Sequence, residues 1–215
     1  MEKRCWLKNG LNSNQLKLAA IIAMTIDHLV CVIFPGYPKQ WWIICLHIIG
    51  RLTAPIMWFM IAEGYHYTRN LKKYISRLFL FAVISHFAYN FAFGIPFIPF
   101  QTSVFNQTSV IWSLAWAVVA IALTDPERVG LKGWKQTLVL IIICVMAFCS
   151  DWSCIAVMAI IGIYYNRGNL KKQVQSMRCW VAMYAAVYFL FIDKVYGIMQ
   201  LGVIICVPFM LNYNG

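Results

Sequence analysis

The chain has 215 residues, of which 62% are hydrophobic and only 12% are charged. A soluble single domain of this size could not cover so much apolar side chain with polar surface, so the composition excludes that class and indicates an integral membrane protein. The formal net charge of +11 raises the alternative of a nucleic-acid-binding protein. The basic residues lie in separate loops and form no continuous basic face, which excludes nucleic acid as a partner.

Apolar runs long enough for membrane helices recur along the whole chain. At about 1.5 Å per residue, about twenty residues cross the roughly 30 Å of hydrocarbon in a bilayer. The runs predict eight helices, at residues 15–34, 41–67, 71–93, 108–123, 136–148, 152–165, 179–192 and 196–211. Pro, Gly and Asn residues typical of turns separate them. We therefore expect an all-α fold, a polytopic membrane helix bundle of about eight transmembrane helices, formed by residues 1–215 as a single domain.

The positions of the basic residues predict the orientation of this bundle. Of the eighteen Lys and Arg residues, all but Lys39, Arg51 and Lys194 fall on the side of the N-terminus when successive helices are counted across the membrane. The positive-inside rule assigns that side to the cytoplasm. Both termini are therefore expected in the cytoplasm.

Asp27 and His28 lie in the middle of the first apolar run, and Arg51 lies in the middle of the second. An ionisable side chain at this depth costs several kcal/mol of free energy, and such residues are usually kept for function. Counted from Lys17, His28 lies about 16 Å into the membrane, and Arg51 lies about 15 Å in from the opposite boundary at Trp41, so their levels are similar. Asp27 is expected to neutralise Arg51 or a donor on another helix. His28, rotated from Asp27 by about 100°, is then expected to point into a cavity.

Other polar residues lie in the second apolar run and in the turn that follows it. Glu63 lies about 18 Å deeper than Arg51, at the cytoplasmic boundary, so the two cannot pair. His47 shares a helix face with Arg51, and its expected role is packing. The following turn carries four basic residues, Arg69, Lys72, Lys73 and Arg77. They are either topology determinants that contact lipid headgroups or a binding site for an anion.

Eight cysteines occur in the chain, most of them inside apolar runs. They show neither a disulfide framework nor the Cys-x-x-Cys spacing of zinc sites, so no metal is expected. Cys149 and Cys154 bracket a short loop on the predicted outer side. They are either bonded to each other or two reduced thiols.

Short sequence elements follow one another in a distinctive order, mostly between residues 14 and 90. They are Lys17 with Ile26-Asp27-His28, Ile49-Gly50-Arg51-Leu52 with Ala54-Pro55-Ile56, Phe59 to Gly64, Thr68-Arg69-Asn70, Lys73-Tyr74 with Arg77-Leu78, Phe81-Ala82 with Ile84-Ser85, and finally Tyr213-Asn214-Gly215. Together they resemble the TraX family, whose namesake acetylates the N-terminus of conjugative pilin. Family members continue past the last element with a Tyr-Pro-x-His segment, which is either missing here or dispensable in this member.

TraX proteins are in turn similar to the acyltransferase-3 group, in which a basic residue and a catalytic histidine are separated by ten residues, as Lys17 and His28 are here. This resemblance implies an enzyme of the bacterial inner membrane that moves an acetyl group from cytoplasmic acetyl-CoA to an acceptor at the membrane or its outer face. The acceptor is expected to be the N-terminal amine of a pilin, with hydroxyls of cell-envelope sugars as the alternative.

The residues and the resemblance together suggest roles. His28 is expected to be the general base, Arg51 to stabilise the oxyanion or hold the acceptor, and Asp27 to keep Arg51 oriented. Glu63 is the fourth candidate catalytic residue and would line the donor entrance with Tyr65. The phosphates of acetyl-CoA would contact Lys17, Arg69, Lys73 and Arg77.

Two other classes stay open for this chain. The charged residues inside the membrane could form the proton relay of a transporter or channel. In an assembly subunit without catalysis, the Asp27–Arg51 pair would serve only to hold two helices together. Stabilisation of the purified protein by CoA is expected for the enzyme and not for these alternatives.

Overall fold

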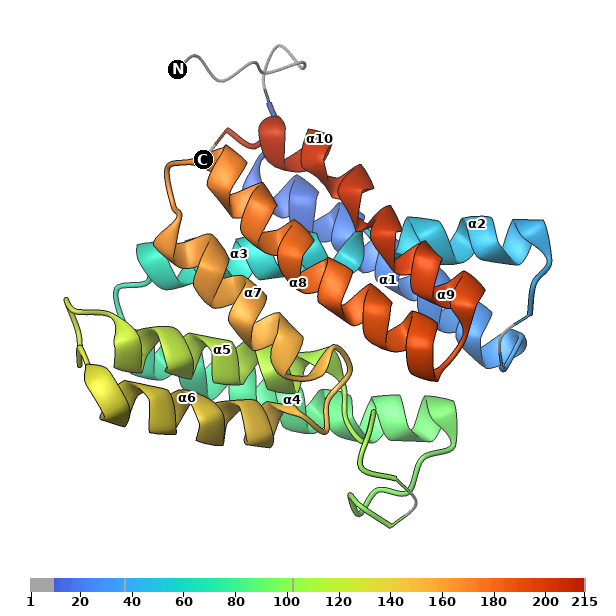
Figure 1. Ribbon diagram of the computed structural model, residues 1–215, viewed down its shortest axis with the longest axis horizontal. Helices are drawn as coiled ribbons and strands as arrows, with labels where there is room; N and C mark the ends of the chain where they lie inside the picture. The colour runs from blue at the N-terminus through green and yellow to red at the C-terminus, as the bar shows by residue number, and fades with distance from the viewer. Residues whose placement is uncertain (1–9, 37, 102, 215) are drawn as a thin grey trace. The chain divides into compact units, whose positions relative to one another are not determined.

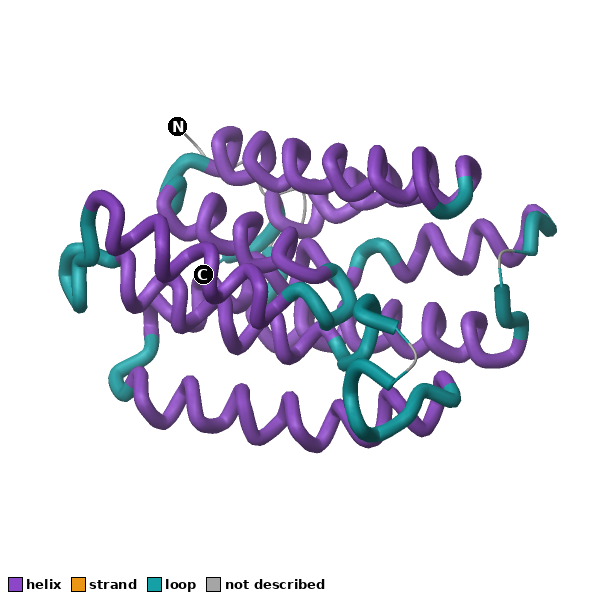
Figure 2. The backbone as a smooth tube through the Cα atoms, turned by 60° about the horizontal axis from the view of Figure 1, so that its bottom comes forward, coloured by secondary structure: helices purple, strands orange, loops and turns teal. Residues whose placement is uncertain are grey.

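The computed structural model describes residues 10–36, 38–101 and 103–214. Within these ranges all named elements are helices (Figure 1). In chain order they are α1 (Ser13–Ile33), α2 (Trp41–Gly50), α3 (Thr53–Tyr67), α4 (Leu71–Phe93), α5 (Val110–Thr124), α6 (Gly133–Ala147), α7 (Ser153–Tyr165), α8 (Leu170–Phe191), α9 (Lys194–Met199), the 3₁₀ segment η1 (Gln200–Cys206) and α10 (Val207–Leu211). Figure 2 shows mostly short loops between them. Lys3, Arg4 and Lys8, which contribute to the predicted orientation, lie outside the described residues.

The predicted all-α fold is confirmed, and the described chain has eight helices if two interrupted ones are each counted once. The first interruption separates α2 from α3 at Arg51 and Leu52, and the second is the 3₁₀ segment between α9 and α10. The predicted start of the seventh helix at residue 179 is wrong, because α8 already begins at Leu170. The Asn169 side chain caps that start by accepting a hydrogen bond from the Lys172 amide at 3.2 Å. The first turns of α8 are polar, so a search for apolar runs does not detect them.

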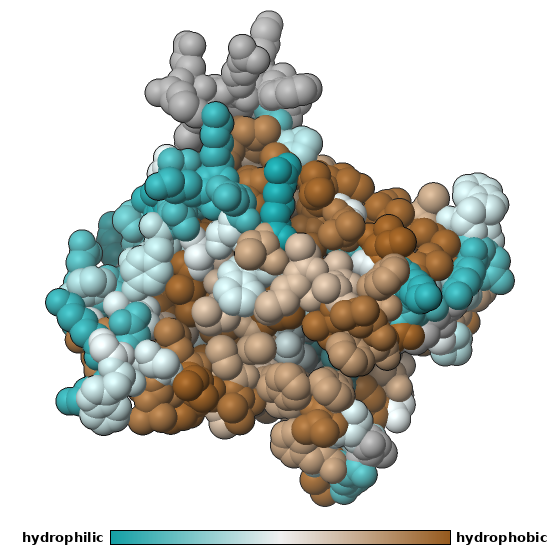
Figure 3. Space-filling model, in the orientation of Figure 1, coloured by the Kyte–Doolittle hydropathy of each residue, from teal (hydrophilic) through white to brown (hydrophobic). Residues whose placement is uncertain are grey.

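Four helical stretches in the described chain are long and apolar enough to cross a membrane: Ser13–Ile33, Trp41–Tyr67, Leu71–Phe93 and Lys194–Leu211. Three further apolar helices, α5, α6 and α7, are shorter. Large apolar side chains are exposed along these helices, with Leu80 at 60% and Phe91 at 81%. Figure 3 shows such residues in brown over much of the visible surface. The protein is therefore a multi-pass membrane protein, and its orientation stays a prediction.

Two compact units make up the chain, and the single-domain organisation stays a prediction. The first comprises Met1–Met60 and Asn166–Gly215, and the second comprises Ile61–Tyr165. In the first unit α1 packs on α2, while η1 packs on both α2 and α8. The two ends of its described chain meet, because the Leu11 amide donates to the Asn212 carbonyl at 2.6 Å and the Asn214 amide donates to the Leu11 carbonyl at 3.1 Å.

The core of the second unit is α5, which packs against α4, α6 and α7 (Figure 1). Small residues on α5 are completely buried, among them Ala115, Ala117 and Ala120. Small side chains let helix backbones approach closely, which is the usual basis of helix packing in a membrane. This unit contains Glu63, Tyr65 and the basic residues at the start of α4.

Candidate functional site

The break between α2 and α3 places Arg51 at the polar centre of the first unit. Arg51 is the C-terminal cap of α2, and α3 begins two residues later at Thr53. Its Nη2 donates to Asp27 Oδ2 of α1 at 2.9 Å, and its Nη1 donates to Gln200 Oε1 of η1 at 2.8 Å. The guanidinium thus joins three helical segments. The expected pairing of Asp27 with Arg51 is confirmed.

Asp27 also holds a second partner, the imidazole of His47 on α2. His47 Nδ1 lies 2.7 Å from Asp27 Oδ1, and the residue is 2% exposed. The rings of His47 and Tyr196 pack edge to face, with centroids 5.4 Å apart. Since a carboxylate accepts hydrogen bonds, it holds the ring proton at Nδ1 and leaves Nε2 as the basic nitrogen. The sequence favoured packing for His47, with proton transfer beside Arg51 as the alternative, and the structure adds a direct contact with Asp27.

Cys31 is a further residue of this cluster that the sequence did not single out. Its Sγ lies within 4.8 Å of both an Asp27 carboxylate oxygen and a ring nitrogen of His47. Asp27 and Cys31 are four residues apart on α1, so they share a helix face. Spacing alone could have linked these two residues, but their approach to His47 depends on how α1 and α2 pack.

Gly50 explains how α1 comes so close to α2. A Cβ at this position would lie 2.5 Å from Asp27 Cγ and nearer still to Asp27 Cβ. No side chain fits there without moving the carboxylate that holds His47 and Arg51. The Gly50-Arg51 sequence therefore combines the close approach with the charge that pairs across it.

Gly50→Ala is expected to lower the free energy of unfolding by about 1–3 kcal/mol, the usual cost of overpacking a helix contact. The measurement is thermal unfolding of the purified protein in detergent. Gly202→Ala is a matched control, because its Cβ would meet Ile48 Cγ2 at 3.4 Å, an ordinary contact distance. Equal melting temperatures for the two variants would contradict the close approach at Gly50.

His28 lies next to Asp27 on α1 and is partly exposed. Its Nδ1 lies 2.8 Å from the Met24 carbonyl oxygen, one turn earlier in the same helix. A carbonyl can only accept, so Nδ1 carries the proton and Nε2 is the nitrogen that can take one up. The ring is therefore oriented by its own helix. Its expected proximity to Arg51 and to a cavity stays a prediction.

Glu63 and Tyr65 lie on the part of α3 that belongs to the second unit, and both are buried, at 7% and 2% exposure. The Tyr65 hydroxyl donates to Asp125 Oδ2 at 2.9 Å, and Tyr164 donates to the same oxygen at 2.9 Å. Burial by itself would raise the pKa of Asp125, but hydrogen bonds from the Glu127 amide and the two tyrosines bring the net pKa below its usual value. A role of Glu63 and Tyr65 in donor binding stays a prediction.

The start of α4 carries the predicted phosphate-binding residues Arg69, Lys73 and Arg77, which are all exposed. Asn70 caps the helix by accepting a hydrogen bond from the Lys73 amide at 3.0 Å. Lys73 and Arg77 are four residues apart and therefore share a helix face, and a helix N-terminus itself favours anions. Lys17, on α1 of the first unit, is also exposed.

A second helix start repeats this local arrangement. The order Asn-Leu-Lys-Lys occurs at residues 70–73 and again at residues 169–172. In both cases the asparagine side chain caps a helix, α4 and α8 respectively. This repetition is readable from the sequence, and it offers a matched control for the basic residues of α4.

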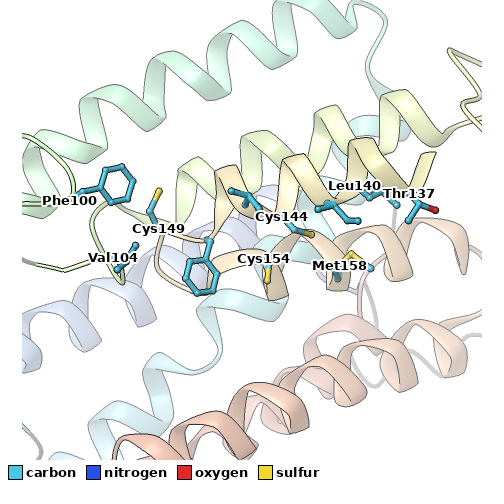
Figure 4. Close-up of a pocket in the computed structure, with 11 residues that line it drawn as sticks. Phe100, Val104, Thr137, Leu140, Cys144, Cys149, Cys154 and Met158 are labelled. Carbon is cyan, nitrogen blue, oxygen red and sulfur yellow. The ribbon is translucent and has the colours of Figure 1, made fainter. Parts of the chain in front are cut away.

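The structure has a cavity of about 720 Å³ in the second unit, between α6, α7 and the loop before α5. Apolar side chains line most of it, together with Cys144, Cys149 and Cys154 (Figure 4). None of the predicted site residues is part of this lining. Cys149 and Cys154 are reduced, so the alternative of two thiols holds here. Cys154 is hydrogen-bonded to the Cys144 thiol.

The fold and this cluster define a multi-pass helical membrane protein with a partly buried Asp–His–Arg site. The chain belongs to the TraX family, whose model, described as TraX protein, matches residues 12–213. It is also 38% identical over 109 residues to a Dichelobacter nodosus protein described as "probable fimbrial assembly protein FimC, serogroup H1". That match covers 50% of this chain and 44% of the relative, so the chain spans less than half of the relative's length. No solved structure matches the chain.

Proposed function

We propose that this protein is a membrane acetyltransferase that moves an acetyl group from acetyl-CoA to the N-terminal amine of a pilin. The observation that carries the proposal is the Asp27 carboxylate held between His47 and Arg51, inside apolar helices of a TraX-family chain. Ionisable groups in such helices are usually functional. The association of the family with pilin acetylation and the fimbrial name of the Dichelobacter relative support a pilin as the acceptor.

In the proposed reaction His28 is the general base. Its Nε2 takes a proton from the acceptor amine as the amine attacks the acetyl carbonyl carbon. Met24 keeps the other ring proton on Nδ1, so the ring presents the correct nitrogen throughout. A neutral imidazole near pH 7 suits this step.

Arg51 stabilises the negative charge that develops on the acetyl oxygen. A fixed guanidinium is effective in this role because it needs no reorganisation when the charge appears. Asp27 and Gln200 are positioning residues that hold its two terminal nitrogens at 2.9 and 2.8 Å. The same ion pair offsets the cost of placing a cation inside the membrane.

The phosphates of acetyl-CoA bind to Arg69, Lys73 and Arg77 in this proposal. Arg69→Gln, Lys73→Gln and Arg77→Gln together should raise the KM for acetyl-CoA, by about tenfold for each charge-assisted hydrogen bond that is lost. Steady-state kinetics with acetyl-CoA as the varied substrate measure this. The control is Lys171→Gln with Lys172→Gln at the start of α8, which should leave KM unchanged. An equal rise in both variants would indicate general surface charge and contradict a donor site on α4.

The test of the function uses the purified full chain in detergent, acetyl-CoA and a peptide with a pilin N-terminus. Mass spectrometry should detect acetylation of the terminal amine, and CoA should raise the melting temperature of the protein. A peptide with a blocked N-terminus and an envelope glycan are the comparison acceptors, and transfer to the glycan alone would change the acceptor to a hydroxyl. No transfer to any acceptor and no stabilisation by CoA would refute the enzyme and favour a transporter or an assembly subunit.

A further inference from the structure

The cluster around Asp27 contains a nucleophile that the proposed reaction does not yet use. The Cys31 sulfur, the His47 imidazole and the Asp27 carboxylate offer atoms within 4.8 Å of one another. The carboxylate contacts His47 Nδ1 at 2.7 Å, so the ring has a fixed orientation. A thiol near an imidazole that a carboxylate orients is the combination of groups that activates a nucleophile in acyl-transfer enzymes.

We propose that Cys31 is an acyl-carrying nucleophile, so that transfer proceeds in two steps through an acetyl-cysteine. This inference rests on the proposed acetyltransferase function. His47 is the base that takes the thiol proton, and Asp27 is the positioning residue that orients the His47 ring through Nδ1. The thiolate is the reactive form of cysteine, and transfer of the thiol proton to His47 generates it.

The two steps balance without any further reactant. In the first, the Cys31 sulfur attacks the carbonyl carbon of acetyl-CoA, a new carbon–sulfur bond forms and the bond to the CoA sulfur breaks. The proton that His47 took from Cys31 passes to the departing CoA thiolate. In the second, the acceptor amine attacks the acetyl-cysteine and loses a proton to His28, the bond to the Cys31 sulfur breaks, and the proton that the amine lost restores the Cys31 thiol.

The position of Cys31 gives this relay a physical advantage. It lies near the C-terminal end of α1, fourteen residues after Lys17, which is about 21 Å along the helix axis. With the N-terminus on the cytoplasmic side, the acetyl group on Cys31 would lie much nearer the outer face than Lys17 does. An acetyl-cysteine therefore separates the acetyl group from CoA before the acceptor arrives.

A metal ion is the competing occupant of the same three side chains. Each oxygen of Asp27 already has a partner, Oδ1 with His47 and Oδ2 with Arg51. A divalent cation would have to compete with the positive guanidinium of Arg51 for this carboxylate. Besides Asp27, only Cys31 and His47 among the described residues would then bind the cation. This geometry favours the nucleophile over the metal.

The experiment incubates the purified full chain with acetyl-CoA in the absence of acceptor. We expect one acetyl group on the Cys31 peptide, released by neutral hydroxylamine as a thioester is. We also expect exchange of isotope between labelled CoA and acetyl-CoA, which only a two-step path allows without acceptor. Cys31→Ala should lower both exchange and transfer by at least about 10³-fold. Cys45→Ala, at an exposed cysteine on α2, should change neither.

The outcomes separate the two proposals. If the unmodified protein acetylates the pilin peptide without isotope exchange, or if Cys31→Ala transfers normally, the acetyl-cysteine is refuted and the acetyltransferase stands. If the unmodified protein shows neither transfer nor exchange, the function itself fails. Labelling and exchange are measured on the unmodified chain, so they decide the question even if Cys31→Ala does not fold. Stabilisation by Zn²⁺ that Cys31→Ala abolishes, without acetyl labelling, would overturn the proposal in favour of a metal site.

Discussion

His28→Ala is expected to lower the rate of acetyl transfer by about 10²–10⁴-fold, the usual contribution of a general base. The imidazole Nε2 is lost, and no other group of that side chain can accept the amine proton. The protein should stay folded, because the hydrogen bond from His28 to Met24 lies within α1 and alanine favours a helix. The measurement is the acetylation rate of the pilin peptide, together with the melting temperature of the variant.

The control for this variant is His86→Ala. His86 lies on α4 in the second unit, and its Nε2 is 2.8 Å from the Phe97 carbonyl oxygen. Removing it should leave the transfer rate close to that of the unmodified protein. If His28→Ala retains near-normal turnover while it is folded, His28 is not the base, and the role would have to pass to His47.

Asp27→Asn is expected to destabilise the protein strongly, by about 3–5 kcal/mol, which is the cost of leaving a buried charge without its partner. The side chains of Asp27 and Arg51 are only 16% and 13% exposed, so water compensates little for the missing carboxylate. The effect should appear as a large drop in the temperature of unfolding in detergent. Acetyl transfer should be lost as well, because both His47 and Arg51 depend on this carboxylate for their orientation.

A second substitution tests the physical reason for that loss. Asp27→Asn combined with Arg51→Met removes the orphaned cation, so the double variant should recover much of the melting temperature while staying inactive. Arg51→Met alone completes the comparison. If the double variant loses as much stability as Asp27→Asn and Arg51→Met lose together, the ion pair contributes little. The stability of this part of the first unit would then come from helix packing alone.

The sequence predicted the ion pair because few ionisable residues are available in this part of the membrane. Asp27 and Arg51 have opposite charges, lie at similar depths and belong to consecutive apolar runs, and a charge at that depth needs a partner. Helix rise alone gave the depths. The depth and charge of the residues could not identify Gln200, because it is distant in the chain and carries no charge.

The sequence did not identify His47 and Cys31 as partners of Asp27. Which side chains meet there depends on the rotation of α1 and α2 about their axes and on the close contact that Gly50 allows. These are properties of two packed helices, and the apolar pattern of each run is too uniform to predict them. The polar start of α8 was missed for a related reason, since hydropathy detects only its apolar half.

The sequence by itself determined the class of this protein, its helices and the residues that break their apolar pattern, because the bilayer demands long apolar helices and penalises each buried charge. Only the tertiary structure decided which polar groups meet. The interruption at Arg51, the absence of a side chain at Gly50 and the return of η1 beside α2 bring Asp27, Cys31, His47, Arg51 and Gln200 together. Contacts between helices depend on angstrom-scale packing, and a one-dimensional pattern of apolar and polar residues does not contain that information.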